Sequence, residues 1–527
     1  MAIEAAGFDL TYLALVPACH NDSMTEPTLT GSKLLAAVDL GSNSFRLMIG
    51  RVLVDGAGAR IEPIDSLKRS VRLAAGLDDK NWLDAAAQGR ALEALARFGD
   101  RLRSFAPEAV RAVGTNTLRV ARNAENFLAT AESALGFPIE VISGHEEARL
   151  IYLGAAHALP ADGRSRLVFD IGGGSTECIV GVDRETRALD SAGTGCVALS
   201  QRYFPDGNVT RSAFEHALSS ARAAFEALAH PLCDLAWDYA VGTSGTAKSL
   251  VQIAREQFGA TNLVRHALEG TLSALLEAGH ADRVELAGLR PERRPVLAGG
   301  LAVMTAAFDE FGIRELDYCD GALRHGVLHD LVGRDTAIDQ RRLSVQRMID
   351  RLGIDLQHAR RVRDTALALF DQGARAAREQ LGARRQMLEW AALLAECGTT
   401  ISYEGFHKHS AYILTWADMP GFSKTEQEAL ALLALAQTGG LRKLRGRVDD
   451  DLGWLAIVSL RIARLLHRTR DSGETPLPAL FLKRRALRLE MPHAWAYRNP
   501  LLHASLVDEA ALWNDVGVFE QFSYQTI

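Results

Sequence analysis

The stretch Leu167-Val-Phe-Asp170-Ile-Gly172-Gly173-Gly174-Ser175-Thr176-Glu177-Cys-Ile-Val180 decides the fold of this chain. Two apolar runs flank a turn that carries three glycines, two hydroxyls and an acid at each end, which predicts strand, tight turn, strand. Glycines let backbone N–H groups approach an anion closely. Two carboxylates would repel a phosphate unless a divalent cation lay between them. The stretch therefore predicts a phosphate site with Mg²⁺.

A second copy of this pattern lies 131 residues earlier, at Asp39-Leu-Gly41-Ser42-Asn43-Ser44. An apolar run again ends in an aspartate, and a glycine, small polar residues and a second apolar run follow. One copy alone is ordinary hairpin chemistry. Two copies at the spacing of a domain indicate two similar α/β domains, each presenting a phosphate-binding hairpin to a shared cleft.

Three further polar turns follow predicted strands. Gly114-Thr-Asn-Thr-Leu-Arg119 offers hydroxyls and an arginine that can bind phosphate oxygens in bidentate fashion. Glu146 and Glu147 open a helix, where acids either favour the helix dipole or supply a general base. Gly242-Thr-Ser244-Gly245 resembles a P-loop only superficially, because Ala247 replaces the required glycine. We expect this third turn to face the same cleft.

The overall composition indicates an ordinary soluble protein of several domains. The chain has 527 residues, of which 48% are hydrophobic and 24% charged. No apolar run reaches the ~18 residues that a membrane-spanning helix needs. Six cysteines are scattered without a C-x-x-C pair, which favours a reducing cytosol and argues against a disulfide framework or a zinc ribbon. We therefore expect a cytoplasmic protein.

Charge is unevenly distributed along the chain. Residues 341–527 carry 26 basic and 21 acidic side chains, a net charge of +5, which leaves −11 for residues 1–340. A basic C-terminal part suits a long polyanion held at one end. Solvated helix faces that happen to be basic would give the same count. The sequence leaves open whether this basic part also touches a membrane surface.

Several motifs together resemble the exopolyphosphatase/guanosine pentaphosphate phosphohydrolase family, and look closest to its long bacterial exopolyphosphatases. The likeness covers nearly the whole chain beyond residue 33. The segments that carry it are Ala37–Phe45, Gly114–Arg119, Ile142–Leu150, Asp170–Glu177, Gly242–Thr246, Asp320–Gly326, His407–Leu414 and Met419–Phe422.

The resemblance implies an α/β fold in which two actin-like (ASKHA, ribonuclease H-like) domains flank a cleft. An all-α HD-like domain and a small α+β C-terminal domain follow. On this basis we expect actin-like domains at 33–155 and 156–333, the helical domain at 334–470 and the C-terminal domain at 471–527. Residues 1–32 are expected to be a poorly ordered extension, and Met24 is an alternative start.

The resemblance also implies the activity: processive removal of terminal phosphate from inorganic polyphosphate with Mg²⁺, by a homodimer. The family's catalytic glutamate falls on Glu147, and its metal-associated acids fall on Asp170 and Glu177. The chain departs from the family where long members have His-Glu, because it has Ala395-Glu396 there. We therefore interpret His358 and the His407/His409 pair as polyanion contacts or core packing and not as metal ligands.

The expected mechanism is in-line attack on the terminal phosphorus by a water molecule that Glu147 deprotonates. Asp170 and Glu177 would hold Mg²⁺, with Asp39 contributing through water. The phosphates would be held by the turns, through Gly41, Ser42, Asn43, Ser44, Arg119, Gly172, Gly173, Gly174, Ser175, Thr176, Gly242, Ser244 and Gly245.

Three other functions are compatible with these motifs. A guanosine pentaphosphate (pppGpp) 5′-phosphohydrolase would run the same chemistry on a nucleotide. A sugar or acetate kinase of the same fold would need ATP and an acceptor. A non-catalytic regulator that binds polyphosphate or an alarmone would not need the Glu147, Asp170 and Glu177 set. No motif indicates nucleic acid as a partner.

Overall fold

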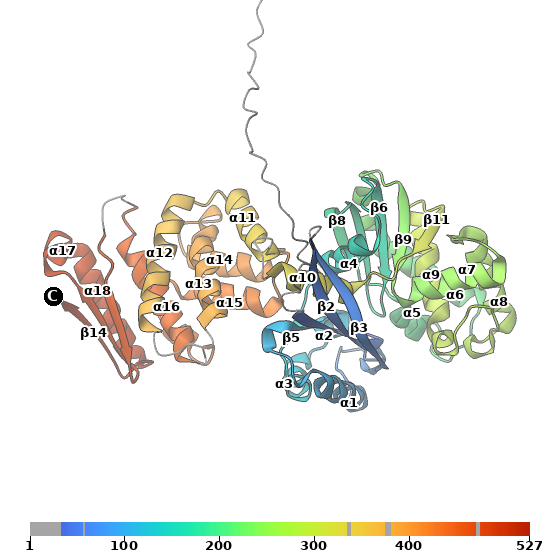
Figure 1. The fold of residues 1–527 in the computed structure, drawn as a ribbon, viewed down its shortest axis with the longest axis horizontal. Helices are drawn as coiled ribbons and strands as arrows, with labels where there is room; N and C mark the ends of the chain where they lie inside the picture. The colour runs from blue at the N-terminus through green and yellow to red at the C-terminus, as the bar shows by residue number, and fades with distance from the viewer. Residues whose placement is uncertain (1–32, 56–57, 335–338, 375–380, 449, 471–474) are drawn as a thin grey trace, which may run out of the picture.

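A computed structural model describes residues 33–527 except 56–57, 335–338, 375–380, 449 and 471–474. The predicted N-terminal extension and Met24 lie outside the described residues. Figure 1 shows two α/β parts at one end, a group of helices beside them, and a small sheet with two helices at the other end. This arrangement agrees with the expected α/β class with a helical C-terminal region.

The first sheet has the strand order β3-β2-β1-β4-β5. Strands β1 to β3 form an antiparallel meander, and β4 and β5 join it in parallel. Helix α1 follows β3 in the chain, α2 and α3 follow β4, and α4 follows β5. The bounds are β1 Lys33–Leu40, β2 Ser44–Asp55, β3 Gly58–Ser70, α1 Ala85–Leu102, β4 Val110–Gly114, α2 Asn116–Val120, α3 Ala124–Leu135, β5 Ile139–Val141 and α4 Gly144–Ala158.

The second sheet repeats this order as β8-β7-β6-β9-β11, with β10 added at the edge beyond β11. Strand β6 is buried along its whole length, which explains its continuous apolar run. The duplication predicted from the two aspartate turns is therefore present at the level of whole sheets. The bounds are β6 Ser165–Ile171, β7 Thr176–Val182, β8 Glu185–Ala192, α5 Cys196–Tyr203, α6 Arg211–Cys233, β9 Tyr239–Thr243, α7 Ser244–Phe258, β10 Leu263–Val264, α8 Arg265–Ala278, α9 Arg294–Glu310 and β11 Glu315–Tyr318.

Helix α10 (Leu323–Arg334) returns from the second sheet to the first. It packs against α4, β1 and β2, although the expected boundary at residue 333 groups it with the second domain. Val327 and Leu328 are buried in the same cluster as Leu35 of β1 and Leu150 of α4. Helix α10 therefore connects the second α/β part to the first before the helical part of the chain begins.

The helical part and the C-terminal sheet share one apolar core. Helix α16 runs through it, and Leu455, Val458 and Ile462 are fully buried there. Strand β14, which the sequence analysis did not predict, pairs in parallel with β13. The bounds are α11 Gln340–Leu352, α12 Leu356–Gly373, α13 Leu381–Leu394, α14 Phe406–Trp416, α15 Lys424–Ala436, α16 Asp451–Leu466, β12 Ala479–Lys483, β13 Ala486–Met491, α17 His493–Arg498, α18 Pro500–Val516 and β14 Gln521–Thr526.

Candidate active site

The two aspartate hairpins meet at a pocket of about 160 Å³ between the two sheets. Asp39 of β1 pairs in register with Arg46 of β2, and Asp170 of β6 pairs with Glu177 of β7. The hairpin tips touch, since a Cβ on Gly173 would lie 2.9 Å from the Cβ of Ser42. Only glycine allows this approach. The duplicated turns therefore form two walls of one site.

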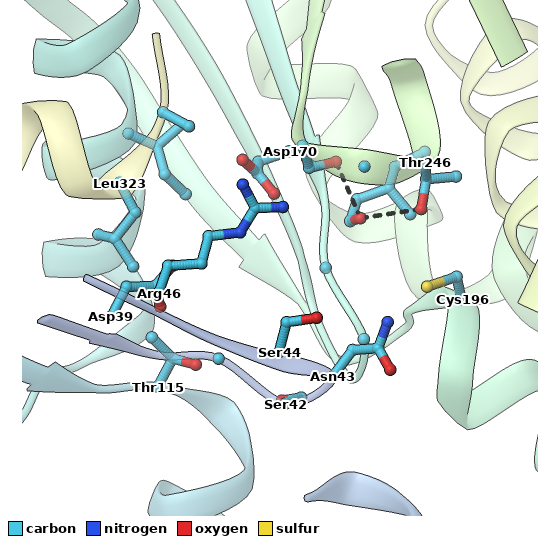
Figure 2. Close-up of a pocket in the computed structure, with 18 of the residues that line it drawn as sticks. Asp39, Ser42, Asn43, Ser44, Arg46, Thr115, Asp170, Cys196, Thr246 and Leu323 are labelled. Atoms are coloured by element: carbon cyan, nitrogen blue, oxygen red, sulfur yellow. Dashed lines mark hydrogen bonds between the residues drawn. The ribbon is translucent and has the colours of Figure 1, made fainter. Parts of the chain in front are cut away.

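Most of the predicted phosphate-binding residues line this pocket. They are Gly41, Ser42, Asn43, Ser44, Gly172, Gly173, Ser175, Ser244 and Gly245, together with Asp39, Glu147 and Asp170. Figure 2 shows Ser42, Asn43 and Ser44 following one another along one wall of the pocket. Backbone N–H groups and hydroxyls at such turns are suited to phosphate oxygens.

Five predicted residues lie outside the pocket lining. Gly174 packs against Asn116, the Thr176 hydroxyl donates to the carbonyl of Thr194, and Gly242 lies within strand β9. Glu177 is completely buried on β7, in register with Asp170 of β6. Arg119 contacts Glu147. The structure thus gives these residues supporting positions around the pocket, and their predicted phosphate or metal contacts stay predictions.

Glu147 is held by Arg119 at the start of helix α4. Arg119 Nη1 donates to Glu147 Oε2 at 2.7 Å and to the carbonyl of Ile142 at 3.0 Å. Burial raises the pKa of Glu147, while the charge of Arg119 opposes that rise. A carboxylate that keeps an elevated pKa and faces a phosphate pocket is suited to general-base work.

Its neighbour Glu146 belongs to a separate buried charge cluster. Arg149 donates two hydrogen bonds to Glu146, at 2.7 and 2.8 Å, and Arg111 lies 3.6 Å from it. Asp330 of α10 pairs with both arginines. Arg149 and Arg111 hold the pKa of Asp330 well below its usual range, although burial alone would raise it. Glu146 is therefore occupied by ion pairs inside the protein, which leaves Glu147 as the candidate base of the two.

Four carboxylates lie near one another in the site: the buried Glu147, Asp170 and Glu177, and the partly buried Asp39. Burial raises the pKa of Asp39 to about 7, and that of Asp170 is raised for the same reason. Burial, and then the charges of Glu147 and Asp170, raise the pKa of Glu177 well above its usual range. Asp39 Oδ1 and Glu177 Oε2 accept no hydrogen bond from any described residue.

These carboxylates fit a hard divalent cation that completes its shell with other ligands. Within the described part of the chain, no three His, Cys, Asp or Glu side chains gather closely enough to hold a metal ion by themselves. Mg²⁺ is commonly bound by one or two carboxylates together with waters and substrate phosphate oxygens. The two carboxylate oxygens without hydrogen bonds provide suitable ligands of this kind.

Five cationic side chains that the sequence analysis did not assign also line the pocket. They are Arg46, Lys68, Lys248, Arg293 and Arg324. Arg46 extends from β2 into the pocket toward Asp170 (Figure 2). Lys248 lies 3.4 Å from Asp320, while the other four form no ion pair with a described residue. Unpaired cations around a small pocket favour a ligand with several negative charges.

One signal in the sequence could have identified Arg46. It stands seven residues after Asp39, as Glu177 stands seven after Asp170, so the repeat places it at the same register position. Arg324 lies within the quoted Asp320–Gly326 motif. Lys68 and Arg293 carry no local signal, because β3 and the short helix Pro291–Arg293 bring them from distant parts of the chain.

Intramolecular partners neutralise much of the basic C-terminal part. Arg384 pairs with Asp450, Arg385 with Asp371 at 2.9 Å, and Arg442 with Asp515 at 2.9 Å.

In the helical part, His358 is buried and its Nε2 lies 3.6 Å from Glu396. Burial would raise the pKa of Glu396, but the neighbouring His358 ring and the charges of Arg464 and Arg470 lower it to about 2. His358 therefore packs in the core, one of the two roles expected for it.

Cys178, Cys196, Cys233, Cys319 and Cys397, the cysteines within the described residues, are all free thiols. None of the described helices combines the length and the apolar character that crossing a membrane requires.

Comparison with known proteins identifies the family. The profile of the Ppx/GppA phosphatase family matches residues 52–335, and that of Ppx/GppA phosphatase domain III matches residues 340–510. The chain is 37% identical over 468 residues to a guanosine-5′-triphosphate,3′-diphosphate pyrophosphatase of Aeromonas hydrophila, covering 88% of this chain and 93% of that protein.

Two other relatives extend this comparison. A protein of the same name from Vibrio vulnificus is 36% identical over 491 residues, covering 92% of this chain and 97% of that protein. The crystal structure of an exopolyphosphatase from Cytophaga hutchinsonii superposes with a TM-score of 0.50 at 22% identity, over 57% of this chain and 98% of that one, and supports the fold alone. The profile matches and the full-length relatives together show that this chain belongs to the Ppx/GppA phosphatase family.

Proposed function

We propose that this protein removes the 5′-terminal phosphate of guanosine 5′-triphosphate 3′-diphosphate. The observation that carries the proposal is the pocket itself, in which two phosphate-type turns, buried carboxylates and unpaired cations surround Glu147. The choice of nucleotide over long polyphosphate is supported by the two named pyrophosphatases, which are 36–37% identical over about nine-tenths of the chain. They favour the alternative over the exopolyphosphatase activity expected first.

In the proposed reaction, the Glu147 carboxylate accepts a proton from a water molecule whose oxygen attacks the terminal phosphorus. A bond forms between that oxygen and phosphorus, and the bond to the bridging oxygen breaks. The electron pair of that bond leaves with the diphosphate. Arg119 orients Glu147 through the 2.7 Å hydrogen bond. A positioned base contributes roughly 10²–10⁴-fold to such a rate.

Asp170 and Glu177 would hold Mg²⁺, with Asp39 assisting through water, and the ion would offset negative charge on the phosphoryl oxygens. The chain's own side chains bind the remaining phosphates. Arg46, Lys68 and Arg324 supply positive charge at the pocket lining, and none of them forms an ion pair with a described residue. Backbone N–H groups of the turns at Gly41 and Gly172 add directional donors.

The five cations also favour inorganic polyphosphate as a second candidate substrate. A side-by-side assay of phosphate release from the nucleotide and from long-chain polyphosphate, with Mg²⁺, separates the two. We expect the larger kcat/KM for the nucleotide. A larger value for polyphosphate would instead assign an exopolyphosphatase. Retained binding of both with no release from either would assign a non-catalytic binding protein. The homodimer stays a prediction that sedimentation can check.

A further inference from the structure

One segment of the helical part, Asp418–Gly421, touches the start of helix α4. The segment lies between α14 and α15, more than 260 residues from α4 in sequence. Two of its residues contact His145 and Glu146, the two residues that precede Glu147 in the chain. The contact therefore joins the helical part to the helix that carries the proposed base.

Gly421 forms the buried half of this contact through its backbone. Its N–H donates to Glu146 Oε2 at 2.8 Å, and its carbonyl accepts from Arg334 at 3.5 Å. Its φ of +93° favours glycine, and a Cβ there would lie 2.9 Å from the backbone nitrogen of Arg341. Because Glu146 is only 1% exposed, Gly421 adds a second donor, beside Arg149, to an oxygen that water cannot reach.

Asp418 forms the second half of the contact through its side chain. Asp418 Oδ2 lies 3.0 Å from His145 Nδ1, and the other ring nitrogen of His145 lies 3.4 Å from Asp190. His145 is thus held between the helical part and strand β8. Its ring is about two-fifths exposed, so this contact is more adjustable than the one at Glu146.

The segment is also anchored in the core of the helical part, on the side away from α4. Met419 and Phe422 are buried there, and the Phe422 ring packs edge-on against Trp390 at 5.0 Å between centroids. The Ser344 hydroxyl donates to the carbonyl of Pro420 at 2.5 Å. A movement of the helical core would therefore move Asp418 and Gly421 together.

We infer that the helical part positions Glu147 for catalysis, with Asp418 and Gly421 acting as positioning residues on the first turn of α4. The inference rests on the proposed role of Glu147. Neither residue lines the pocket, so neither touches substrate. Their effect should appear in kcat, because a base displaced by less than 1 Å loses rate while the phosphate turns continue to bind. Such misplacement costs up to ~10²-fold.

The full-length Asp418→Ala variant tests the inference with two measurements. We expect kcat to fall about tenfold with KM changed less than twofold, since about 1.4 kcal/mol of lost positioning corresponds to that factor. We also expect faster amide hydrogen exchange in residues 143–150 and unchanged exchange in α6. Asp418→Asn, which keeps a hydrogen-bond acceptor, should retain most of the rate. Glu428→Ala is the matched control, because Glu428 is exposed on α15 and pairs with no described residue.

A double-mutant cycle adds a check that a general loss of stability would not pass. If His145 and Asp418 act together, the His145→Ala/Asp418→Ala double variant loses less than the product of the two single losses. Wild-type kcat or wild-type exchange at 143–150 in Asp418→Ala overturns the inference, as do fully independent losses. If the wild-type protein releases no phosphate from nucleotide or polyphosphate, the proposed function fails, and exchange alone decides whether the segment holds the helix.

Discussion

Arg119 and Glu147 form a hydrogen-bonded ion pair, with 2.7 Å between Nη1 and Oε2, at the junction of α2 and α4. Arg119 was expected among the phosphate ligands. That role stays a prediction, and in the structure its guanidinium joins the carboxylate that we propose as base to the carbonyl of Ile142, next to the end of β5. Together with the separate charge cluster around Glu146, this pairing supports Glu147 as the proposed base.

Replacement of Glu147 by glutamine should abolish most turnover and leave substrate binding intact. The amide keeps the size of the side chain and can still contact Arg119, but it cannot take a proton. We expect kcat to fall by roughly 10²–10⁴-fold, with the dissociation constant of the nucleotide changed only slightly. Phosphate release and equilibrium binding measure the two effects. Glu146→Gln is an unsuitable control because Glu146 lies in the buried cluster, and wild-type kcat in Glu147→Gln would remove Glu147 from the mechanism.

Replacement of Arg119 by lysine should lower kcat more than it raises KM. Lysine keeps the charge but cannot donate to Glu147 and to Ile142 with one planar group. The base would lose its orientation while the pocket lining stayed unchanged. We expect a loss of about tenfold in kcat, measured from steady-state phosphate release. A rise in KM alone would show that Arg119 acts on the substrate phosphates, as the sequence first suggested.

Replacement of Arg46 by methionine should raise KM more than it lowers kcat, the opposite of the result expected for Arg119→Lys. Arg46 points into the pocket and has no described ion-pair partner, so its charge is available to the substrate. We expect KM to rise about tenfold, with an effect that weakens as ionic strength increases. Arg69→Met is the matched control, because Arg69 is an exposed arginine on β3 outside the pocket lining. Equal effects of the two variants would contradict a specific role for Arg46.

The free energy of unfolding should fall as the pH drops from about 6.5 toward 4. His157 of α4 and His329 of α10 stack at 3.5 Å between ring centroids. Burial lowers the pKa of His157 from 6.5 to about 4 and that of His329 to about 3. In this window the unfolded chain binds more protons than the folded one, so stability present above pH 6.5 is lost on acidification.

Thermal unfolding between pH 7 and pH 4 measures this effect. The slope is at most about 1.4 kcal/mol per pH unit for each proton, and smaller here because both rings are partly exposed. His329→Gln should flatten the pH dependence. The same change at the exposed His216, for which burial is small, should leave it as in the wild type. Parallel curves for all three proteins would contradict the assignment.

Replacement of Asp170 by asparagine should stabilise the protein in the absence of Mg²⁺. Burial raises the pKa of Asp170, and Asp170 in turn raises the pKa of Asp39 and Glu177 by repulsion. Removing one charge relieves this repulsion, so we expect Tm at pH 8 to rise by a few degrees. Added Mg²⁺ should raise the Tm of the wild type more than that of the variant. Equal shifts in the two proteins would place the ion elsewhere.

The hairpins at Asp39 and Asp170 could be predicted from sequence because their chemistry is local. An apolar run, an aspartate and a glycine-rich turn fix both the strand direction and the position of the carboxylate. The start of α4 was also predictable, since Ser143 caps the helix directly before the two glutamates. The sequence alone could not separate Glu146 from Glu147. That distinction depends on Arg111, which joins the buried cluster from β4 across the fold.

Strand β14 and the cationic lining were missed for a different physical reason. Residues Gln521–Thr526 are mostly polar and half-buried, so their periodicity is weak, and only pairing with β13 makes them a strand. Lys68 reaches the pocket from strand β3 and Arg293 from the short helix Pro291–Arg293, and the two have no shared motif. The basic C-terminal residues were counted correctly, but ion pairs such as that of Arg385 with Asp371 use many of the charges that a polyanion would need.

The hydrogen bond between Gly421 and Glu146 makes the two α/β parts depend on the helical part for one buried contact. A minimal enzyme that consisted only of the two α/β sheets and their helices would lose this donor and the Asp418 contact together. Glu146 would then keep one oxygen facing an opening where the helical part had been. In such a shortened chain Arg149 alone would donate to that oxygen, and water or an added side chain would have to replace the second donor.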